Sequence, residues 1–271
     1  MKSRIHSLLA LVAAITFAAL PLHAQVKVGD LVQADVLDGG LTKRGTYMTA
    51  LRLTLSDGWK TYWRAPGDAG IPPQFDWGRS QNLGHLEITW PTPHVFDQNG
   101  MQSIGYKTQL VLPVEITPAD PSRPVQLRGK VEVGICKDIC VPGTLAIDHQ
   151  LDAKAGRNPA IAAAMAQRPF TEKEGGVTSA TCRLSPVEGG MRLQARIAMP
   201  SAGGQEVAVI EPGSPRIWAS QTETRREGGA LLAVSDLIPV TGGPLAIDRS
   251  AIRITVLGKR HAVDIRGCTP G

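Results

Sequence analysis

The sequence predicts an all-β protein with two antiparallel β-sandwich domains joined by a short helical linker. Of the 271 residues, 42% are apolar, which rules out a mainly disordered chain and is enough for the cores of about two domains. The 29 glycines and 20 prolines favour many turns between short elements and argue against an all-helical bundle. Apolar and polar residues also alternate in one short run after another, which is typical of half-buried strands.

The first half of the chain contains a series of candidate strands. Leu51, Leu53 and Leu55 alternate with polar residues, as in a strand that is buried on one face. Similar runs, bounded by Gly, Pro, Asn or Asp, cover residues 32–37, 86–90, 109–116, 125–135 and 140–151. A succession of strands without intervening helices indicates an antiparallel sandwich.

One helix is predicted, over residues 159–167. Asn158 is a suitable N-cap, Pro159 fits the first helical position, and Pro169 ends the run. Its alanine-rich composition indicates a connector. We therefore expect a first domain over residues 25–155, a helical linker over 156–176 and a second β domain over 177–271. Candidate strands of the second domain cover residues 179–184, 191–198, 206–210, 231–235, 252–257 and 261–265.

Residues 1–24 have the features of a signal peptide. Lys2 and Arg4 precede an apolar stretch over residues 8–22, and the small residue Ala24 suits a signal peptidase. The stretch is shorter than the roughly 20 residues that a membrane span needs, although an uncleaved anchor is an alternative. We expect a mature chain from about Gln25 outside the cytoplasm, which in a Gram-negative bacterium is the periplasm. No later window approaches 18 apolar residues, so stable membrane insertion is not expected.

Charge and common motifs exclude several classes of function. Loss of the leader lowers the formal net charge from +5 to +3, which is too little to indicate a nucleic-acid partner. The sequence lacks a phosphate-binding Gly-x-x-x-x-Gly-Lys-Ser/Thr loop, a His-Glu-x-x-His helix and a Gly-x-Ser-x-Gly turn. No organic cofactor is therefore expected.

Aromatic residues are concentrated in the first domain. Nine of the twelve fall between Tyr47 and Tyr106, where most of them should pack in the sandwich core. Residues 59–77 are too rich in Gly and Pro for a regular element and too aromatic for a free loop. We expect this segment to pack over one end of the sandwich, and some of its aromatic side chains to line a site.

The four cysteines divide into two pairs by their spacing. Cys182 and Cys268 enclose about 86 residues of the second domain, for which loop-closure entropy predicts a stabilisation of roughly 4 kcal/mol. This pair is interpreted as a structural disulfide. Cys136 and Cys140 lie between two strand-like runs, at or near the end of a hairpin, where a disulfide would close only a small ring.

Three interpretations of Cys136 and Cys140 stay open on the residues alone. They can form a structural hairpin disulfide, or a reversible redox pair that another protein's thiolate attacks. They can also bind a soft metal such as Cu(I), with His94 or Met101 as further ligands. There is no Cys-x-x-Cys motif, so the chain is not itself a thioredoxin.

Several spaced motifs resemble one known family. In order along the chain they are Asp57-Gly-Trp-Lys-Thr-Tyr-Trp-Arg64, Pro66-Gly-Asp-Ala-Gly-Ile-Pro-Pro73, Phe75-Asp-Trp77, Trp90-Pro91, Gly105-Tyr106, Leu112-Pro113 and Cys136-Lys-Asp-Ile-Cys-Val-Pro142. Over about residues 30–150 the chain is similar to the N-terminal periplasmic domain of DsbD-type thiol:disulfide interchange proteins. The variant it resembles most is that of ScsB, associated with suppression of copper sensitivity. The second domain loosely resembles the extra periplasmic domain of the ScsB type.

The resemblance implies an immunoglobulin-like sandwich whose cysteine pair carries electrons. It assigns the attacking role to Cys140 and the resolving role to Cys136. It also implies a cap loop over the pair, which corresponds here to Phe96, Asp97, Gln98, Asn99, Gly100 and Met101. DsbD has two acidic residues followed by an aromatic in that loop, and this chain departs from that pattern. Any ring that shields the sulfurs must therefore come from Phe96, Tyr106 or the 59–77 segment, with Tyr62 and Trp63 as candidates.

We therefore expect a periplasmic electron relay that passes reducing equivalents through Cys136 and Cys140. Its donor would be a thioredoxin-like domain or a membrane protein of the DsbD or CcdA kind. Its client would be a periplasmic disulfide isomerase or a related oxidoreductase. As an enzyme it would be a protein-disulfide reductase that depends on this separate donor. A copper-tolerance protein that binds Cu(I) through the same cysteines and a binding module with two structural disulfides are the alternatives.

Overall fold

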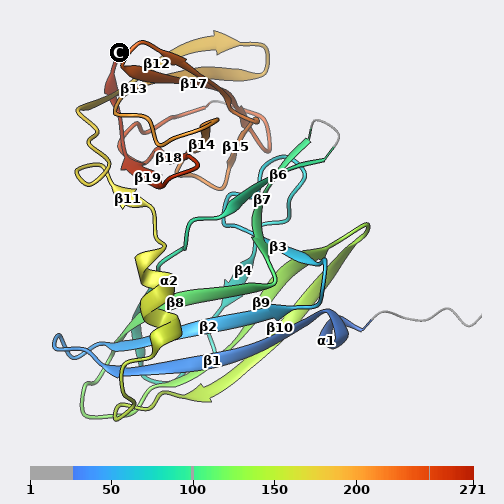
Figure 1. Cartoon of the computed structure of the whole chain (residues 1–271), viewed down its shortest axis with the longest axis vertical. Coiled ribbons are helices and arrows are strands. Elements are labelled where there is room, and N and C mark those ends of the chain that lie inside the picture. The colour runs from blue at the N-terminus through green and yellow to red at the C-terminus, as the bar shows by residue number, and fades with distance from the viewer. Residues whose placement is uncertain (1–26, 99–100, 244) are drawn as a thin grey trace, which may run out of the picture.

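The computed structural model describes residues 27–98, 101–243 and 245–271, and it forms two β lobes (Figure 1). The N-terminal lobe contains strands β1 to β10, and the C-terminal lobe contains strands β11 to β20. The leader predicted over residues 1–24, with its cleavage before Gln25, lies outside the described residues. Within the described residues, no helix is both long and apolar enough to cross a membrane.

The N-terminal lobe is a sandwich of two sheets. The first sheet has the order β1 (Val32–Leu41), β2 (Tyr47–Leu55), β8 (Gln109–Pro118) and β5 (Leu83–Ile88). The second has the order β10 (Cys140–Gln150), β9 (Gln126–Cys136), β3 (Lys60–Tyr62), β7 (Met101–Lys107) and β6 (His94–Gln98), and β4 (Gln74–Asp76) also pairs with β9. A four-residue helix, α1 (Val28–Leu31), precedes β1. All pairs in both sheets are antiparallel, as the alternating pattern predicts.

The core of this lobe lies between the two sheets. Alternate residues of β2 and β8, such as Leu51, Leu53 and Leu112, are almost fully buried there, because successive side chains of a strand point to opposite faces. Trp63 and Ile135 reach the same core from the second sheet. The period-two pattern of the sequence therefore corresponds to a real buried face.

Helix α2 (Pro159–Ala166) connects the lobes and lies beside β8 (Figure 1). Its N-terminus has the predicted cap, because the Asn158 side chain accepts a hydrogen bond of 3.0 Å from the backbone N–H of Ala160. The linker is not entirely helical, however. Strand β11 (Phe170–Thr171), inside the range predicted as linker, pairs in parallel with a strand of the C-terminal lobe.

The C-terminal lobe is a second sandwich. One sheet has the order β11, β19 (Ala262–Arg266), β18 (Arg253–Leu257) and β14 (Val207–Glu211). The other has the order β15 (Ile217–Ala219), β17 (Ala230–Pro239), β13 (Gly190–Ala198), β12 (Ser179–Val187) and β20 (Thr269–Pro270), with β16 (Glu223–Glu227) also paired to β17. Cys182 and Cys268 form a disulfide with a Cα–Cα distance of 5.7 Å, which links the start of this lobe to its end.

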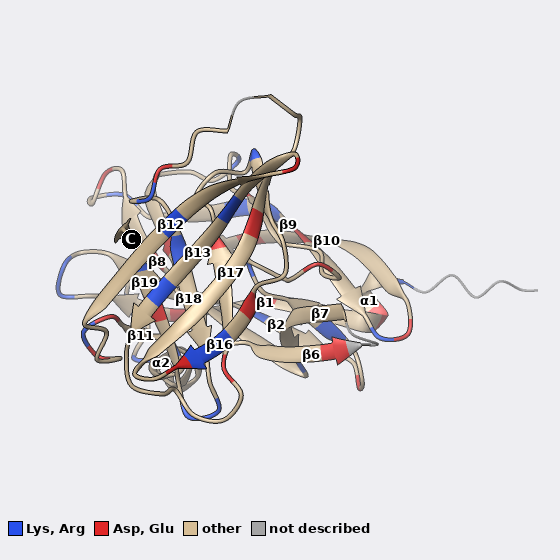
Figure 2. Ribbon diagram, turned by 90° about the horizontal axis from the view of Figure 1, so that it is seen from above, with Lys and Arg blue, Asp and Glu red and all other residues tan. Residues whose placement is uncertain are grey.

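Basic and acidic residues are intermixed on the outer strands of the C-terminal lobe. Figure 2 shows basic residues on β13, an acidic residue on β17 and both signs on β16. Arg192 of β13 donates to both carboxylate oxygens of Asp236 on β17, at 2.7 and 2.9 Å, across a registered strand pair. Such exposed cross-strand pairs keep neighbouring strands in register and each contribute little free energy.

The architecture confirms the prediction of an all-β chain with two antiparallel sandwiches and a short helical connection. The described residues contain two short parallel pairings, β11 with β19 and β12 with β20, which the periodicity did not predict. Strands β3, β4, β6 and β7 were also not predicted, because they are short or interrupted and carry no clear alternation. These four strands build much of the candidate site.

Candidate functional site

Cys136 and Cys140 lie at the end of the β9–β10 hairpin. Cys136 is the last residue of β9 and Cys140 is the first of β10, and the two residues are directly paired in register. They form a disulfide with a Cα–Cα distance of 4.1 Å. The three residues between them make the turn, in which the N–H of Lys137 donates to the carbonyl of Ile139. The strand register therefore positions the two sulfurs.

The two half-cystines differ in their exposure. Cys136 is 1% exposed, because β9 is covered at this point by β3 on its other side. Cys140 is exposed, because β10 is the edge strand of the sheet. The turn residues 137–139 are exposed as well. A thiolate from another protein can therefore reach Cys140 but not Cys136.

Tyr62, at the end of β3, is the polar group next to the disulfide. Its hydroxyl donates to Sγ of Cys136 at 2.9 Å and lies 3.5 Å from Sγ of Cys140. The side chain is almost completely buried, and this burial raises the pKa of the phenol above its usual value. Tyr62 is therefore a neutral hydrogen-bond donor aimed at the sulfur that an external attack would release.

A loop over residues 63–73 covers Tyr62. Strands β3 and β4 both pair with β9. The loop that joins β3 to β4 therefore leaves the sheet after Tyr62 and returns to it at β4. The carbonyl of Ala69 lies 3.4 Å from the Tyr62 hydroxyl. Opposite the loop, a Cβ on Gly134 would lie 2.8 Å from Cβ of Ile71, so only glycine lets Ile71 pack this closely. The aromatic segment predicted to cover one end of the sandwich thus covers the disulfide environment.

Two lysines lie on the same face of the second sheet. Lys60 is the cross-strand partner of Cys136, and its amine donates to the Ser103 hydroxyl at 3.0 Å. The amine lies 5.0 Å from the centre of the Phe96 ring, and that of Lys107 lies 4.9 Å from it. Burial, and then the charge of Lys107, lower the pKa of Lys60. The register thus places two lysines on the face of the sheet that carries Cys136, and a positive charge on this face favours a thiolate.

A Lys60→Met protein is expected to react more slowly with iodoacetamide after reduction of the Cys136–Cys140 pair. Loss of the buried amine removes a charge that favours the thiolate, so we expect a fall of roughly three- to tenfold at pH 7. Lys130→Met is the matched control, because Lys130 is an exposed lysine on the same strand as Cys136. Equal rates in the two variants would show that Lys60 does not act on the thiolates.

The structure places the predicted lining residues in two different environments. Tyr62 contacts both sulfurs, and Phe96 lies across the sheet from them against Lys60. Trp63 and Tyr106 are instead buried in the sandwich core, where the Tyr106 hydroxyl donates to the carbonyl of Pro91 at 2.8 Å. Trp63 directly follows Tyr62, and Tyr106 pairs with Thr61, so both side chains point to the face of the sheet opposite to that of Tyr62. The structure therefore does not bring these two side chains to the sulfurs.

The predicted cap loop is the end of the β6–β7 hairpin. Asp97 pairs with Gln102, and Gln98 pairs with Met101, in the register of these strands. Asp97 is exposed and Met101 is 55% exposed, while Asn99 and Gly100 lie outside the described residues. The cap is thus an extended hairpin at the far side of the sheet from β10.

The alternative Cu(I) ligands are not gathered into one cluster. The ring of His94 packs on Phe96 at 6.3 Å between centroids, and Met101 lies at the start of β7. The described ranges contain no group of three or more His, Cys, Asp or Glu residues that could hold a metal ion. Cys136 and Cys140 are joined to each other, so a metal could bind them only after reduction.

Lys60 and the loop residues Ala69 and Ile71 were not among the predicted site residues. One sequence signal could have indicated Lys60: it lies two positions before Tyr62, and side chains two apart in a strand share a face. The loop residues carry no such signal, because their place depends on the return of the chain to β9.

Comparisons with known proteins identify one family model and a structure of similar fold. Residues 32–150 match the family model described as thiol:disulfide interchange protein DsbD, N-terminal. The chain is also similar in structure to the N-terminal periplasmic domain of ScsB from Proteus mirabilis, with a TM-score of 0.68, 20% sequence identity, and coverage of 89% of this chain and 95% of that chain. The search of curated proteins found no match. The resemblance inferred from the motifs is confirmed, and the structural match extends beyond residue 150 into the C-terminal lobe.

Proposed function

We propose, on the premise that residues 32–150 match the DsbD N-terminal family, that this protein relays thiol-disulfide exchange through Cys136 and Cys140. The observation that carries the proposal is the asymmetry of the pair. Cys140 is exposed, whereas Cys136 is buried and accepts a hydrogen bond from Tyr62. A disulfide with a purely structural role needs neither feature.

Reduction of the protein proceeds in two displacements. A donor thiolate attacks Sγ of Cys140, the Cys136–Cys140 bond breaks, and its electron pair leaves on Sγ of Cys136 as a thiolate. The Tyr62 hydroxyl is already 2.9 Å from that sulfur and stabilises the charge that forms there. A second donor thiolate then attacks the donor sulfur of the mixed disulfide and releases Cys140 as a thiolate. The donor is oxidised to a disulfide, and the protein now holds two thiols.

Delivery to a client reverses these roles. The exposed Cys140 thiolate attacks a client disulfide, and one client sulfur leaves as a thiolate. Cys136 then attacks Sγ of Cys140, which releases the second client thiolate and re-forms the Cys136–Cys140 bond. Two electrons pass to the client in each cycle. Cys140 is therefore the attacking residue and Cys136 the resolving residue in this proposal.

The chemistry requires a dithiol donor and a disulfide client, and the resemblance to DsbD-type proteins indicates which proteins these are. In this proposal the donor is a thioredoxin-like domain or a membrane protein of the DsbD or CcdA kind. The client is a periplasmic disulfide isomerase or a related oxidoreductase. The similarity to a periplasmic domain and the predicted signal peptide support a periplasmic location. In this compartment such a relay needs a dedicated electron source, because disulfides persist there.

The reduction potential of the pair tests the proposal. Protein is equilibrated in graded glutathione or dithiothreitol buffers, and free thiols are trapped and counted by mass spectrometry. We expect Cys136–Cys140 to open at a potential well above the roughly −300 mV that is typical of structural disulfides, while Cys182–Cys268 stays closed as an internal control. If both disulfides resist reduction to the same potential, the pair is structural and the relay fails.

A further inference from the structure

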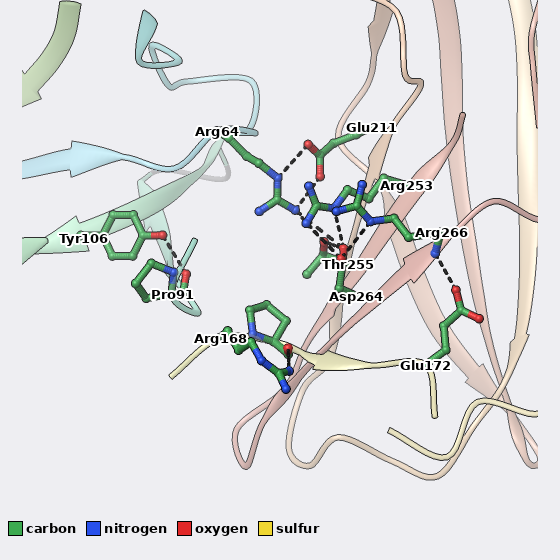
Figure 3. A network of polar contacts seen from close by, with 11 residues as sticks. Arg64, Pro91, Tyr106, Arg168, Glu172, Glu211, Arg253, Thr255, Asp264 and Arg266 are labelled. Atoms are coloured by element: carbon green, nitrogen blue, oxygen red, sulfur yellow. Dashed lines mark hydrogen bonds and ion pairs between the residues drawn. The ribbon is translucent and has the colours of Figure 1, made fainter. Parts of the chain in front are cut away.

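Arg64 connects the loop that covers Tyr62 to the C-terminal lobe. Its Nε and Nη2 atoms donate to the two carboxylate oxygens of Glu211, at 3.0 and 2.9 Å, and Nη2 also donates to the Thr255 hydroxyl at 3.1 Å. Figure 3 shows the guanidinium reaching across from the N-terminal lobe to these groups and toward Asp264. The carboxylate of Asp264 lies 3.9 Å from Nη2. A bidentate contact of this kind fixes direction as well as distance.

This contact is largely shielded from solvent. The Arg64 side chain is 12% exposed and that of Glu211 is 23% exposed, whereas most ion pairs in the described residues join more exposed groups. The guanidinium also lies 3.9 Å from the centre of the Trp63 ring, which is fully buried in the N-terminal core. Burial lowers the pKa of Arg64, and the charge of Glu211 opposes that shift. Arg64 thus depends on acceptors that the other lobe supplies.

The backbone around Arg64 leads directly to the disulfide. Arg64 follows Trp63 and lies two residues after Tyr62, whose hydroxyl contacts Cys136. On its other side, the carbonyl of Pro66 accepts a hydrogen bond from the N–H of Ile104 in β7. The loop then continues to Ala69, which contacts the Tyr62 hydroxyl. In sequence, Arg64 therefore lies between Tyr62 and Ala69, the loop residue whose carbonyl contacts the Tyr62 hydroxyl.

We propose that Arg64 is a positioning residue through which the C-terminal lobe, by way of Glu211, holds Tyr62 against Cys136. The inference rests on the proposed function and assigns a role to the second domain in it. When Glu211 holds Arg64, the Tyr62 hydroxyl is directed at the sulfur that leaves as a thiolate. When the contact is lost, the loop shifts and that hydrogen bond weakens, so opening of the disulfide slows.

The test measures how fast dithiothreitol opens the Cys136–Cys140 disulfide in the full chain, with acid quenching, thiol trapping and mass spectrometry. Tyr62→Phe is expected to slow opening about tenfold, because a hydrogen bond to a charged group is lost. Glu211→Gln is expected to slow it about fivefold. The double variant is expected to be no slower than Tyr62→Phe alone, because both substitutions remove the same hydrogen bond.

Asp236→Asn is the matched control, because it breaks a bidentate arginine–carboxylate pair that lies wholly within the C-terminal lobe. It should leave the rate unchanged. If Glu211→Gln does not fold, as judged by circular dichroism, Thr255→Val replaces it, alone and combined with Tyr62→Phe. This substitution removes one contact of Arg64 and is expected to slow opening of the disulfide about twofold. The inference would be overturned if Glu211→Gln and Thr255→Val left the opening rate unchanged. It would also be overturned if a double variant with Tyr62→Phe opened more slowly than Tyr62→Phe alone. A protein that reacts normally with dithiothreitol but with no donor or client would instead refute the relay.

Discussion

A Cys140→Ser protein is expected to lose exchange with its redox partners, whereas a Cys136→Ser protein is expected to accumulate as a stable mixed disulfide. In the first variant the remaining sulfur is the buried one, 1% exposed, so no partner can reach it. In the second, the exposed Cys140 still attacks a partner, but the residue that would resolve the bond is missing. Non-reducing electrophoresis after incubation with a thioredoxin-fold protein oxidised at its active site, followed by mass spectrometry of the adduct, measures both outcomes.

The double variant Cys136→Ser/Cys140→Ser serves as the control for adducts that form through the other cysteines. It should form none, because Cys182 and Cys268 are joined and Cys182 is completely buried. An adduct that forms through Cys136 in the Cys140→Ser protein would reverse the assigned roles. It would also mean that the hairpin end opens far enough to expose the buried sulfur.

Removal of the other disulfide is expected to have the largest effect on stability. The Cys182–Cys268 bond closes a loop with a sequence separation of 86, and the Cys182→Ser/Cys268→Ser protein should lose about 4 kcal/mol of unfolding free energy. The bond joins β12 to the segment before β20, so the loss falls on the C-terminal lobe. Urea unfolding followed by tryptophan fluorescence and circular dichroism measures it.

The hairpin pair provides the comparison for this stability measurement. Cys136 and Cys140 have a sequence separation of only 4, for which the same entropic model gives about 2 kcal/mol. Cys136→Ser/Cys140→Ser should therefore be clearly more stable than Cys182→Ser/Cys268→Ser. Equal losses in the two proteins would contradict the division into one redox pair and one staple.

Part of the candidate site could be predicted from local sequence. Two alternating runs flank Cys136 and Cys140, so their place at a hairpin end follows from strand periodicity. The face of the sheet to which the neighbouring aromatic side chains point could not be predicted from this periodicity. Strand β3 has three residues, too few for a period to appear, so Tyr62 and Trp63 were equal candidates for lining the site. The pairing of β3 with β9 directs Tyr62 to the sulfurs, and Trp63, the residue after β3, consequently points to the core.

From the sequence alone one obtains the all-β class, the two sandwiches with their helical connection, the two cysteine pairs by spacing, and the DsbD-type motifs. These features depend on residues that are close together or on composition, and so they can be read along the chain. The exposure of Cys140 against the burial of Cys136, the cross-strand contact of Lys60 with Cys136, and the Arg64–Glu211 contact appear only in the packed structure. Each of these features depends on which strands become neighbours in the folded protein. Arg64 and Glu211, for example, are 147 positions apart in the sequence, so no local sequence pattern can predict their contact.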